Sequence, residues 1–271
     1  MKYRTFKPSQ KLDAWVKHYW TLESEQERDL NKQTIVPDGC MEMVFHYGDL
    51  YKQYRENTES FIQPRCFVIG QLTQPLVIEP TGKTGIFSIR FHPEGFSSFA
   101  TLSIKEMENT PVSLEILFGE RGLELEQFVL KKQSIAERIQ HVESFLRTQL
   151  THVTTIDRIV KSTTETILTA HGQLPIIELT KRLEVSRRQL ERKFSKAIGL
   201  SPKQLSKIIR LQAVLKMVIR KEFTSFTALA YEGDYYDQAH FIKDFKEFTG
   251  QTPKEFYGPH LQLSSLFYGM Q

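Results

Sequence analysis

Short apolar runs, separated by glycine and proline, make up most of the first hundred or so residues. Clear examples are FVIG at 67–70, LVIE at 76–79 and GIFSIRF at 85–91. The turn signal Pro37-Asp38-Gly39 precedes a further run, MEMVFHY at 41–47. Runs of this length, rich in β-branched and aromatic residues and bounded by turn residues, are typical of strands. The pattern predicts an N-terminal sandwich or small β-barrel.

Longer segments with helical periodicity follow Pro93. Residues 94–102 predict a short helix, and residues 113–170 predict several longer ones. Apolar side chains recur there three and four residues apart, which places them on one side of a helix. They are Ile139, Val142, Phe145, Leu146 and Leu150, followed by Ile156, Ile159, Val160, Ile167 and Leu168. His171-Gly172-Gln173 then predicts a helix end and a linker.

An internal repeat occupies the C-terminal third. Six positions recur in chemical type at a fixed offset of 51 residues, which is a sign of duplication. Leu190, Phe194, Gly199, Ser201, Pro202 and Lys203 correspond to Phe241, Phe245, Gly250, Thr252, Pro253 and Lys254. The same offset relates Ser186 to Asp237, two residues that favour helix N-caps, and Arg192 to Lys243, two cations. We infer that one supersecondary unit is duplicated.

The first copy has the pattern of two short helices joined by a tight turn. Ile176, Leu179 and Leu183 form an apolar face, after which Glu184-Val185-Ser186 breaks the periodicity. Ser186 is suited to cap a second helix that ends at Gly199. The inward positions of this second helix are Leu190, Phe194 and Ala197, and the outward ones are Arg188, Glu191, Arg192 and Ser195. The unit is a predicted helix-turn-helix, whose second helix suits a DNA major groove.

The second copy follows the same pattern. Phe226, Leu229 and Ala230 anchor its first helix, and Asp237 caps its second. The inward positions of the second helix are Phe241, Phe245 and Phe248, and the outward ones are Gln238, Ala239, Ile242 and Lys243. A continuous helix over 202–219 connects the two copies. Two recognition helices about 34 Å apart enter successive major grooves of one duplex. The competing interpretation is a plain helical domain whose Phe and Leu stripes serve only its core.

The charge distribution favours the DNA interpretation. Residues 173–271 contain 16 Lys and Arg against 10 Asp and Glu, whereas the remainder contains 20 against 22. A basic module on a mildly acidic body is typical of polyanion binding.

The C-terminal third resembles the AraC/XylS family of transcription regulators. The resemblance covers 173–257, about a third of the chain. It is carried by Leu183-x-Val185-Ser186-Arg187-Arg188-Gln189-Leu190-x-Arg192-x-Phe194, Gly199-x-Ser201-Pro202, Arg210-Leu211-x-x-Ala213, Tyr235-Tyr236-Asp237-Gln238-Ala239-His240-Phe241-x-x-x-Phe245-Lys246 and Phe248-Thr249-Gly250-x-Thr252-Pro253-x-x-Phe256. Two departures are Thr180, where the family usually has Ala, and Asp234, where Gly is usual.

The resemblance implies a promoter-binding regulator, commonly an activator that contacts RNA polymerase. It implies base contacts by Arg188, Glu191 and Arg192 in one groove and by Gln238, His240 and Lys243 in the next. Contacts to phosphate, which position the protein without specifying sequence, fall to Arg187, Ser201, Lys203 and Lys254. Two roles stay open: His240 suits packing or phosphate as well as a base, and Glu191 suits cytosine or a partner arginine.

The N-terminal part resembles, more loosely, the cupin-like sensor domain found in these regulators. The similar residues are Pro37-Asp38-Gly39-Cys40-x-Glu42-x-Val44-Phe45 and Phe91-His92-Pro93-x-Gly95-Phe96. The resemblance implies control by a small-molecule effector or by homodimerisation. Trp20, Phe45 and Tyr47 are candidate effector contacts, with Trp15 and Tyr19 nearby, although ordinary core packing explains such aromatic residues as well. Helical stripes within 113–170 suit a dimer interface or packing within one chain.

Nothing in the sequence predicts a catalytic or metal site, and no cofactor is expected. The histidines are isolated, without a His-x-His pair, and Cys40 and Cys66 lack acid–base neighbours. A cupin-type metal oxygenase, a repair alkyltransferase and a DNA-free interaction module are the alternative functions. Two cysteines, no signal peptide and no long apolar run favour a cytoplasmic protein that makes no membrane contact.

These observations predict an α+β chain in three parts. They are a cupin-like small β-barrel over 1–105, a helical linker or dimerisation segment over 106–171 and an all-α, homeodomain-like double helix-turn-helix domain over 172–271.

Overall fold

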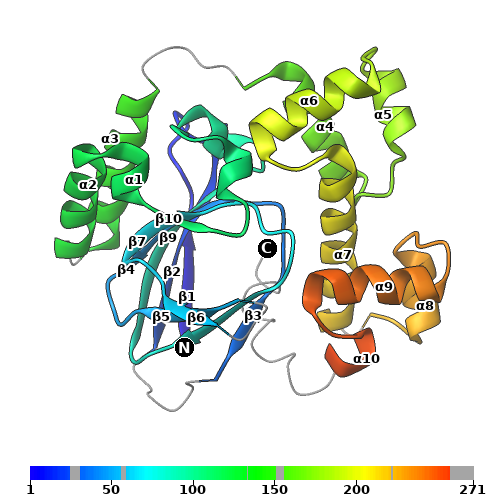
Figure 1. The fold of residues 1–271 in the computed structure, drawn as a ribbon, viewed down its shortest axis with the longest axis horizontal. Helices are drawn as coiled ribbons and strands as arrows, with labels where there is room; N and C mark the ends of the chain where they lie inside the picture. Colours follow the sequence, from blue (N-terminus) through cyan, green and yellow to red (C-terminus); the bar gives the residue numbers. More distant parts are fainter. Residues whose placement is uncertain (25–30, 56–58, 133, 151–155, 221, 257–271) are drawn as a thin grey trace.

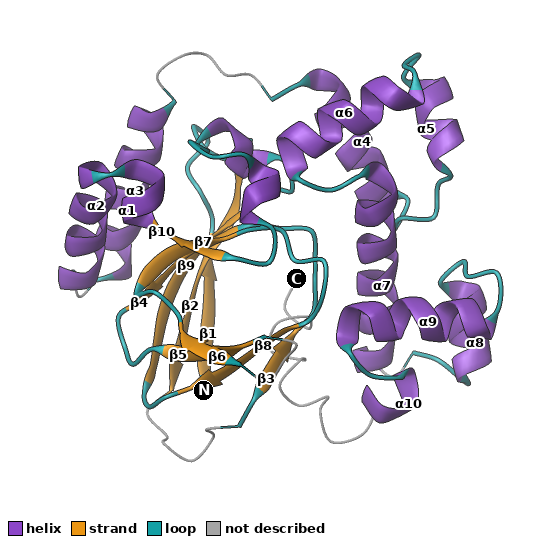
Figure 2. Cartoon of the chain, viewed as in Figure 1, coloured by secondary structure: helices purple, strands orange, loops and turns teal. Residues whose placement is uncertain are grey.

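A β-rich unit and a helical unit lie side by side in the computed structural model of the chain (Figures 1 and 2). The structure describes residues 1–24, 31–55, 59–132, 134–150, 156–220 and 222–256. Residues 257–271, which belong to the predicted C-terminal domain, lie outside this range. The α+β class and the order of the two units confirm the prediction.

The larger sheet of the β-rich unit has six antiparallel strands in the order β1-β2-β9-β4-β7-β10. Its strands are β1 (Lys2–Phe6), β2 (Val16–Ser24), β4 (Glu42–His46), β7 (Cys66–Ile69), β9 (Thr84–Phe91) and β10 (Pro111–Ser113). Strand β9 is buried along its whole length, because it lies in the middle of the sheet with packed side chains on both faces. Sequence alone indicated β4, β7 and β9, but none of the strands before residue 33.

The smaller sheet has four antiparallel strands in the order β3-β8-β5-β6. They are β3 (Gln33–Ile35), β5 (Tyr51–Tyr54), β6 (Ser60–Ile62) and β8 (Leu76–Pro80). Apolar side chains from both sheets form one cluster, which includes Val44 and Phe67 from the larger sheet and Ile78 from the smaller one. The two sheets therefore face each other across a shared interior.

Helices cover the other face of the larger sheet. They are α1 (Leu114–Phe118), α2 (Glu120–Lys131) and α3 (Ile135–Gln149), preceded by the 3-10 helices η2 (Gly95–Ser98) and η3 (Ile104–Met107). Met43 and Phe45 of β4 pack with Val142 and Leu146 of α3, whereas Val44 packs toward the smaller sheet. This follows from strand geometry, because successive side chains point to opposite faces. The predicted helix over 94–102 is thus a single 3-10 turn, η2.

The helical unit contains seven helices among the described residues. They are α4 (Arg158–Thr169), α5 (Ile176–Arg182), α6 (Arg187–Ile198), α7 (Pro202–Arg220), α8 (Phe226–Glu232), α9 (Gln238–Thr249) and α10 (Pro253–Phe256). One core joins them, and α7 runs through its centre with ten buried residues. None of the described helices has the length and apolarity needed to cross a bilayer.

Helix α4 packs with the C-terminal helices. Val160 and Ile167 are fully buried in the core of the helical unit, whereas Val142 and Leu146 of α3 are buried against the larger sheet. The predicted segment 106–171 therefore divides between the two units. Its apolar stripes were expected to form either a dimer interface or packing within one chain, and most of their side chains pack within the chain.

Candidate nucleic-acid interface

Helices α5 and α6 form the first helix-turn-helix. The turn between them places Glu184 at φ +52°, and Ser186 then caps α6 by accepting a hydrogen bond from the Gln189 backbone N–H at 3.2 Å. Helix α6 ends at Gly199, whose φ of +82° is left-handed and favours glycine. Leu190 and Phe194 are fully buried. The predicted cap, helix and stop are all confirmed.

Helices α8 and α9 repeat this arrangement. Asp234 adopts φ +55° in the turn, and the Asp237 carboxylate accepts from the His240 backbone N–H at 2.7 Å. Helix α9 ends at Gly250, at φ +75°. Aspartate tolerates the left-handed region better than most residues, so Asp234 can stand where the family usually has glycine. The offset of 51 residues relates equivalent caps and stops, which confirms the duplication.

Helix α7 holds the second unit through an ion pair with a buried carboxylate of α9, which sequence reasoning missed. The Lys207 ammonium lies 3.0 Å from an Asp244 oxygen and 2.9 Å from a Glu247 oxygen. Burial lowers the pKa of Lys207, but these hydrogen bonds outweigh it and the net pKa is raised. Arg210 also donates to the Asp234 backbone carbonyl at 3.0 Å. A sequence signal existed, because Asp244 stands on the apolar side of α9 between Phe241 and Phe245.

The predicted base-contacting side chains of α6 lie outside the core. Arg188 and Arg192 are exposed, and Glu191 is half-buried. The Glu191 carboxylate accepts a hydrogen bond from Arg187 Nε at 2.8 Å, so in this structure it holds a neighbouring arginine. Arg187 is itself exposed. The outward face of α6 is therefore strongly cationic.

The corresponding face of α9 is more varied. Gln238 and Lys243 are exposed, and the Gln238 side-chain oxygen accepts from the Thr227 hydroxyl of α8 at 3.0 Å. His240 is half-buried, packs edge-on against Tyr235 with ring centroids 5.4 Å apart, and lies 3.5 Å from Asp244. Packing thus fixes the His240 ring at the edge of the outward face.

The predicted phosphate contacts lie at the N-termini of α7 and α10. Ser201 and Gln204 form a reciprocal cap, in which each side chain accepts from the other's backbone N–H, at 3.2 Å and 2.9 Å. Thr252 and Glu255 form the equivalent cap of α10. Lys203 and Lys254 follow Pro202 and Pro253, and both lysines are exposed. The Ser201 hydroxyl therefore has a structural partner already.

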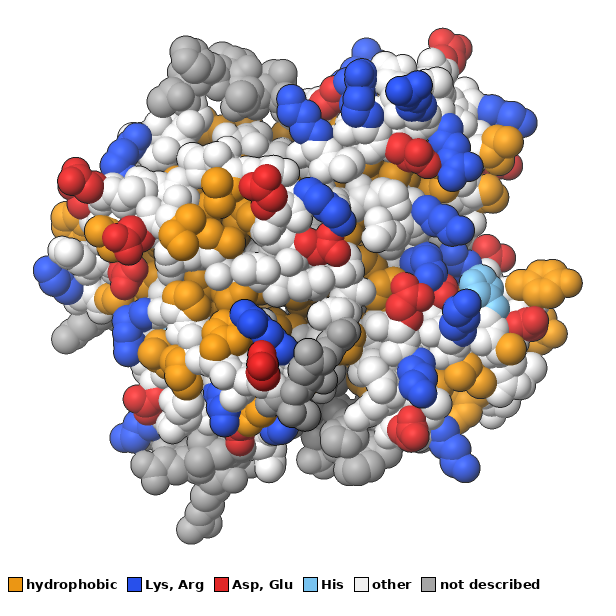
Figure 3. Space-filling view, viewed as in Figure 1, with side chains coloured by type: hydrophobic (Ala, Val, Ile, Leu, Met, Phe, Trp, Pro, Cys, Tyr) orange, Lys and Arg blue, Asp and Glu red, His pale blue; other side chains and the backbone are white. Residues whose placement is uncertain are grey.

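Lys and Arg side chains gather along the edge of the molecule formed by α6 and α9 (Figure 3). The two helices differ in their surroundings. The end of α6 lies against the β-rich unit, where a β-carbon on Gly199 would be 2.9 Å from the Ile104 side chain of η3. Arg192 borders a cleft of about 600 Å³ together with Ser97 and Ser98 of η2 and with Asp157, which pairs with Lys193. Helix α9 packs mainly on α7, α8 and α10.

Two family models match the chain. One, described as a helix-turn-helix domain, matches residues 179–257 and so spans the duplicated unit. The chain is a DNA-binding transcription regulator whose helix-turn-helix domain is of the AraC type. The second model, a domain of unknown function (DUF6597), matches residues 4–113 of the regulator, from β1 to β10.

Several solved structures resemble the chain at low sequence identity. ToxT from Vibrio cholerae is 12% identical with a TM-score of 0.46, over 95% of this chain and 98% of that chain. ToxT from Vibrio cholerae O395 is 10% identical with a TM-score of 0.44, over 88% and 95%. The C-terminal domain of AraT, a response regulator from Geobacillus stearothermophilus, is 23% identical with a TM-score of 0.36, over 38% and 87%. No curated protein matches the chain.

The regulator also has an internal cavity between its two sheets, of about 90 Å³. Trp20, one of the predicted effector contacts, lines it, but Phe45 and Tyr47 do not. Phe45 points to the opposite face of β4 and is buried beneath the helices. Tyr47 packs against Arg138 of α3, whose guanidinium carbon lies 3.8 Å from the ring centre. Their neighbours Val44 and His46 line the cavity instead.

The two thiols lie in surroundings that disfavour the thiolate. Burial raises the pKa of Cys40 and of Cys66. A thiolate is the nucleophilic form of cysteine, so these surroundings oppose alkyl transfer to either residue. Among the described residues, no three His, Cys, Asp or Glu side chains are placed to hold a metal ion.

Proposed function

We propose that α6 and α9 read base edges in two successive major grooves of promoter DNA. Arg188, Glu191 and Arg192 act in one groove, and Gln238, His240 and Lys243 act in the other. The observation that carries this proposal is the duplicated unit itself: each copy buries its apolar side and presents its long polar side chains outward. Arginine suits guanine, because its planar fork donates to O6 and N7 together.

Phosphate contacts hold the two helices in register. Arg187, Lys203 and Lys254 are exposed cations next to the recognition surfaces, and Ser201, whose hydroxyl oxygen caps α7, still has its hydroxyl hydrogen to donate. Such contacts add affinity without sequence preference, because every nucleotide carries the same phosphate.

Selection of bound sequences from a random duplex pool tests the proposal. We expect a site with two half-sites about one helical turn apart. Binding to that site, followed by fluorescence anisotropy, should weaken steeply as salt rises, because phosphate contacts release counterions. Enrichment of no sequence, or an affinity insensitive to salt, would support the DNA-free interaction module instead.

We further propose that the β-rich unit controls DNA binding through a small molecule. The cavity between the two sheets supports this, because it lies inside the folded unit and polar side chains line part of its wall. A thermal-shift screen of metabolites on the full chain tests it. A regulator of this kind acts in the cytoplasm, and we assign it no enzymatic reaction.

The family resemblance also favours an activator that acts as a homodimer and contacts RNA polymerase. Two exposed apolar side chains of α2 support self-association, because Leu123 and Phe128 are 37% and 52% exposed. Sedimentation of the full chain tests the dimer, with Phe128→Ala expected to weaken it. Transcription in vitro from the selected site tests activation; a decrease in transcript would identify a repressor.

A further inference from the structure

Two buried polar atoms beside the cavity lack hydrogen-bond partners. Gln33 and His46 line the cavity and are only 4% and 2% exposed. Among the described residues, Gln33 Nε2 and His46 Nδ1 have no partner. Leaving such a buried group unpaired costs about 1–3 kcal/mol. The pair therefore indicates a ligand that supplies the missing bonds.

The hydrogen bonds around His46 fix which partner each atom needs. Gln63 Nε2 donates to Gln53 Oε1 at 3.0 Å, which turns Gln63 Oε1 toward His46 Nε2 at 3.3 Å. His46 Nε2 is therefore the protonated nitrogen, and burial lowers the pKa of the ring to about 4, which keeps it neutral. His46 Nδ1 is a bare acceptor, whereas Gln33 Nε2 is a donor. A ligand must bring a donor to the first and an acceptor to the second.

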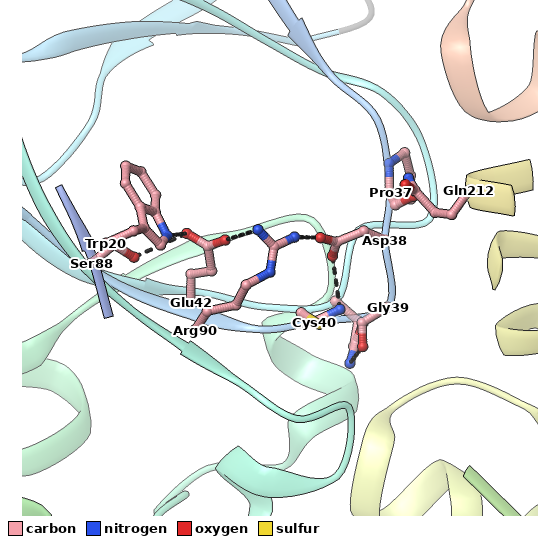
Figure 4. A network of polar contacts seen from close by, with 10 residues as sticks. Trp20, Pro37, Asp38, Gly39, Cys40, Glu42, Ser88, Arg90 and Gln212 are labelled. Atoms are coloured by element: carbon pink, nitrogen blue, oxygen red, sulfur yellow. Dashed lines mark hydrogen bonds and ion pairs between the residues drawn. The ribbon is translucent and has the colours of Figure 1, made fainter. Parts of the chain in front are cut away.

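The described wall holds one cation, Arg90, between two carboxyl groups, and burial raises the pKa of one of them, Glu42, to about 7. Arg90 forms ion pairs with both Asp38 and Glu42, at 3.3 Å for Glu42 (Figure 4). Glu42 also accepts from Trp20 Nε1 at 3.1 Å and from the Ser88 hydroxyl at 3.0 Å. Arg90 is the one Lys or Arg among the described lining residues. An anionic ligand would meet an arginine that two carboxylates already hold.

We propose that this cavity binds a small uncharged molecule that carries both a hydrogen-bond donor and an acceptor on an apolar body. The proposal rests on the effector control proposed above and names the ligand class. The remaining wall is largely aliphatic and aromatic, for example Leu22, Ile78 and Phe67. A cavity of about 90 Å³ is smaller than the roughly 150 Å³ that holds benzene in an engineered protein. The ligand should therefore have at most about six non-hydrogen atoms, the number in benzene.

Three compounds of similar shape test the ligand class on the full chain. Isobutyramide has a donor and an acceptor, isobutyrate has only acceptors, and isobutylammonium has only donors. Ligand-observed NMR should detect saturable binding of isobutyramide and roughly tenfold weaker binding of the two ions, each of which leaves one buried atom unpaired. Gln33→Leu and His46→Phe should each weaken isobutyramide by roughly tenfold. His141→Phe, on α3 outside the cavity, is the matched control.

Several results would overturn the ligand class. These are failure of isobutyramide to bind, equal or tighter binding of either ion, and unchanged affinity in both cavity variants. Circular dichroism and Tm identify a variant that has not folded, and the two variants are independent of each other. DNA binding without any probe is measured separately. Loss of DNA binding in the wild-type chain would refute the regulator proposal while leaving the cavity result valid.

A different observation carries a second inference, concerning residues 36–40, which connect β3 to β4. Val36, Asp38 and Cys40 line the cavity. The same segment packs on α7: the Pro37 carbonyl accepts from Gln212 Nε2 at 2.7 Å, and Val36 belongs to the core of the helical unit. A β-carbon on Gly39 would lie 2.6 Å from the Leu205 side chain. One short loop is thus a wall of the cavity and a support of the helix between the two DNA-reading units.

Asp38 fixes this loop on the cavity side. Its carboxylate pairs with Arg90 through one oxygen and accepts from the Cys40 backbone N–H at 2.9 Å through the other (Figure 4). Gln212 is 8% exposed and fixes the loop on the α7 side. Since the two bonds hold opposite sides of one five-residue loop, a change at either should be felt at the other.

We infer that residues 36–40 transmit changes in the cavity to α7, with Asp38 and Gln212 as positioning residues. A double-mutant cycle on DNA affinity tests this without any ligand. Asp38→Asn keeps an acceptor for Cys40 but removes the charge that pairs with Arg90, and Gln212→Leu removes the donor to Pro37. We expect the effect of the double variant on the Kd for DNA to differ from the product of the single effects by roughly threefold or more.

Gln173→Leu supplies the matched control for the cycle. Gln173 also donates from Nε2 to a backbone carbonyl, that of Glu232 at 3.3 Å, but both residues lie within the helical unit. Its combination with Asp38→Asn should be multiplicative. A multiplicative result for Asp38 with Gln212 would overturn the inference. The same cycle on Tm needs no DNA, and additive Tm shifts there would also count against the coupling, even if DNA binding itself failed.

Discussion

Individual side chains of α6 and α10 should differ in their roles, with one contacting bases and the other contacting phosphate. Arg192 is exposed on the outward side of α6, one turn beyond Arg188. We expect Arg192→Ala to cost about 1–3 kcal/mol at the selected site and to relax base preference at one position. Repeating the duplex selection with the variant measures both effects. Equal loss across all sequences would show that Arg192 contacts phosphate.

Lys254 should contact phosphate rather than a base, in contrast to Arg192. It is exposed at the start of α10, where a cation suits phosphate. Lys254→Ala should weaken binding to all sequences by a similar factor and reduce the salt slope by about one. A change in the selected sequence would contradict this assignment.

His46 makes the free energy of unfolding of the β-rich unit depend on pH. Burial lowers its pKa from 6.5 to about 4, so the unfolded chain binds a proton that the folded chain does not. The stability is fully present above pH 6.5 and is lost as the pH falls toward 4, by about 3 kcal/mol at most. His46→Phe keeps a ring beside Tyr51 and Phe67 but removes the titration.

Urea unfolding of this variant at pH 7 and pH 5 checks the prediction. The free energy of unfolding should fall less in His46→Phe than in the wild-type chain. The loss of the Gln63 hydrogen bond lowers both values alike, so the difference between the two pH values is the measurement. Burial also lowers the pKa of His18 to about 4, so part of the loss of stability at acidic pH should persist in the variant. Equal slopes in the two proteins would show that His46 titrates normally.

At the scale of elements, the repeat was predictable because residues next to each other in the sequence determine where its helices begin and end. Ser186 and Gly199 mark α6, and Asp237 and Gly250 mark α9, through caps and left-handed stops that need no distant partner. Strand β2 was missed for the opposite reason. Buried residues run together from Tyr19 to Leu22, so no alternation marks it as a strand. Its place is set by pairing with β1 and β9, far apart in sequence.

The two N-caps offer a direct comparison of the duplicated units. Ser186 and Asp237 each accept a backbone N–H in the first turn of a recognition helix. Ser186→Ala and Asp237→Ala should each lower the free energy of unfolding by about 1 kcal/mol, because a helix N–H loses its acceptor. Chemical denaturation of both variants measures this. A much larger loss in only one unit would mean that the two copies do not share one capping mechanism.

On the scale of the whole molecule, sequence patterns show which helix faces are buried but not what buries them. The sequence correctly predicted an apolar face on α4. Its residues Val160 and Ile167, however, pack in the helical unit rather than beside α3. The cavity depends on the same long-range information, since strands from both sheets supply its wall. Trp20 could be proposed from its type, whereas Gln33 and His46 could not, because their unpaired atoms exist only once the sheets face each other.

The duplication also provides a test of how the two units hold together. Gly199 and Gly250 end equivalent helices with φ of +82° and +75°, so alanine at either position costs about 1–2 kcal/mol of backbone strain. Their surroundings differ: a β-carbon on Gly199 would be 2.9 Å from Ile104 of the β-rich unit, whereas one on Gly250 would make an ordinary contact of 3.6 Å with Pro75 of the same unit. Gly199→Ala should therefore destabilise the chain more than Gly250→Ala, and hydrogen exchange should rise at η3 in the first variant alone. Equal losses of unfolding free energy in the two variants, with unchanged hydrogen exchange at η3, would mean that the β-rich unit does not fix the position of α6.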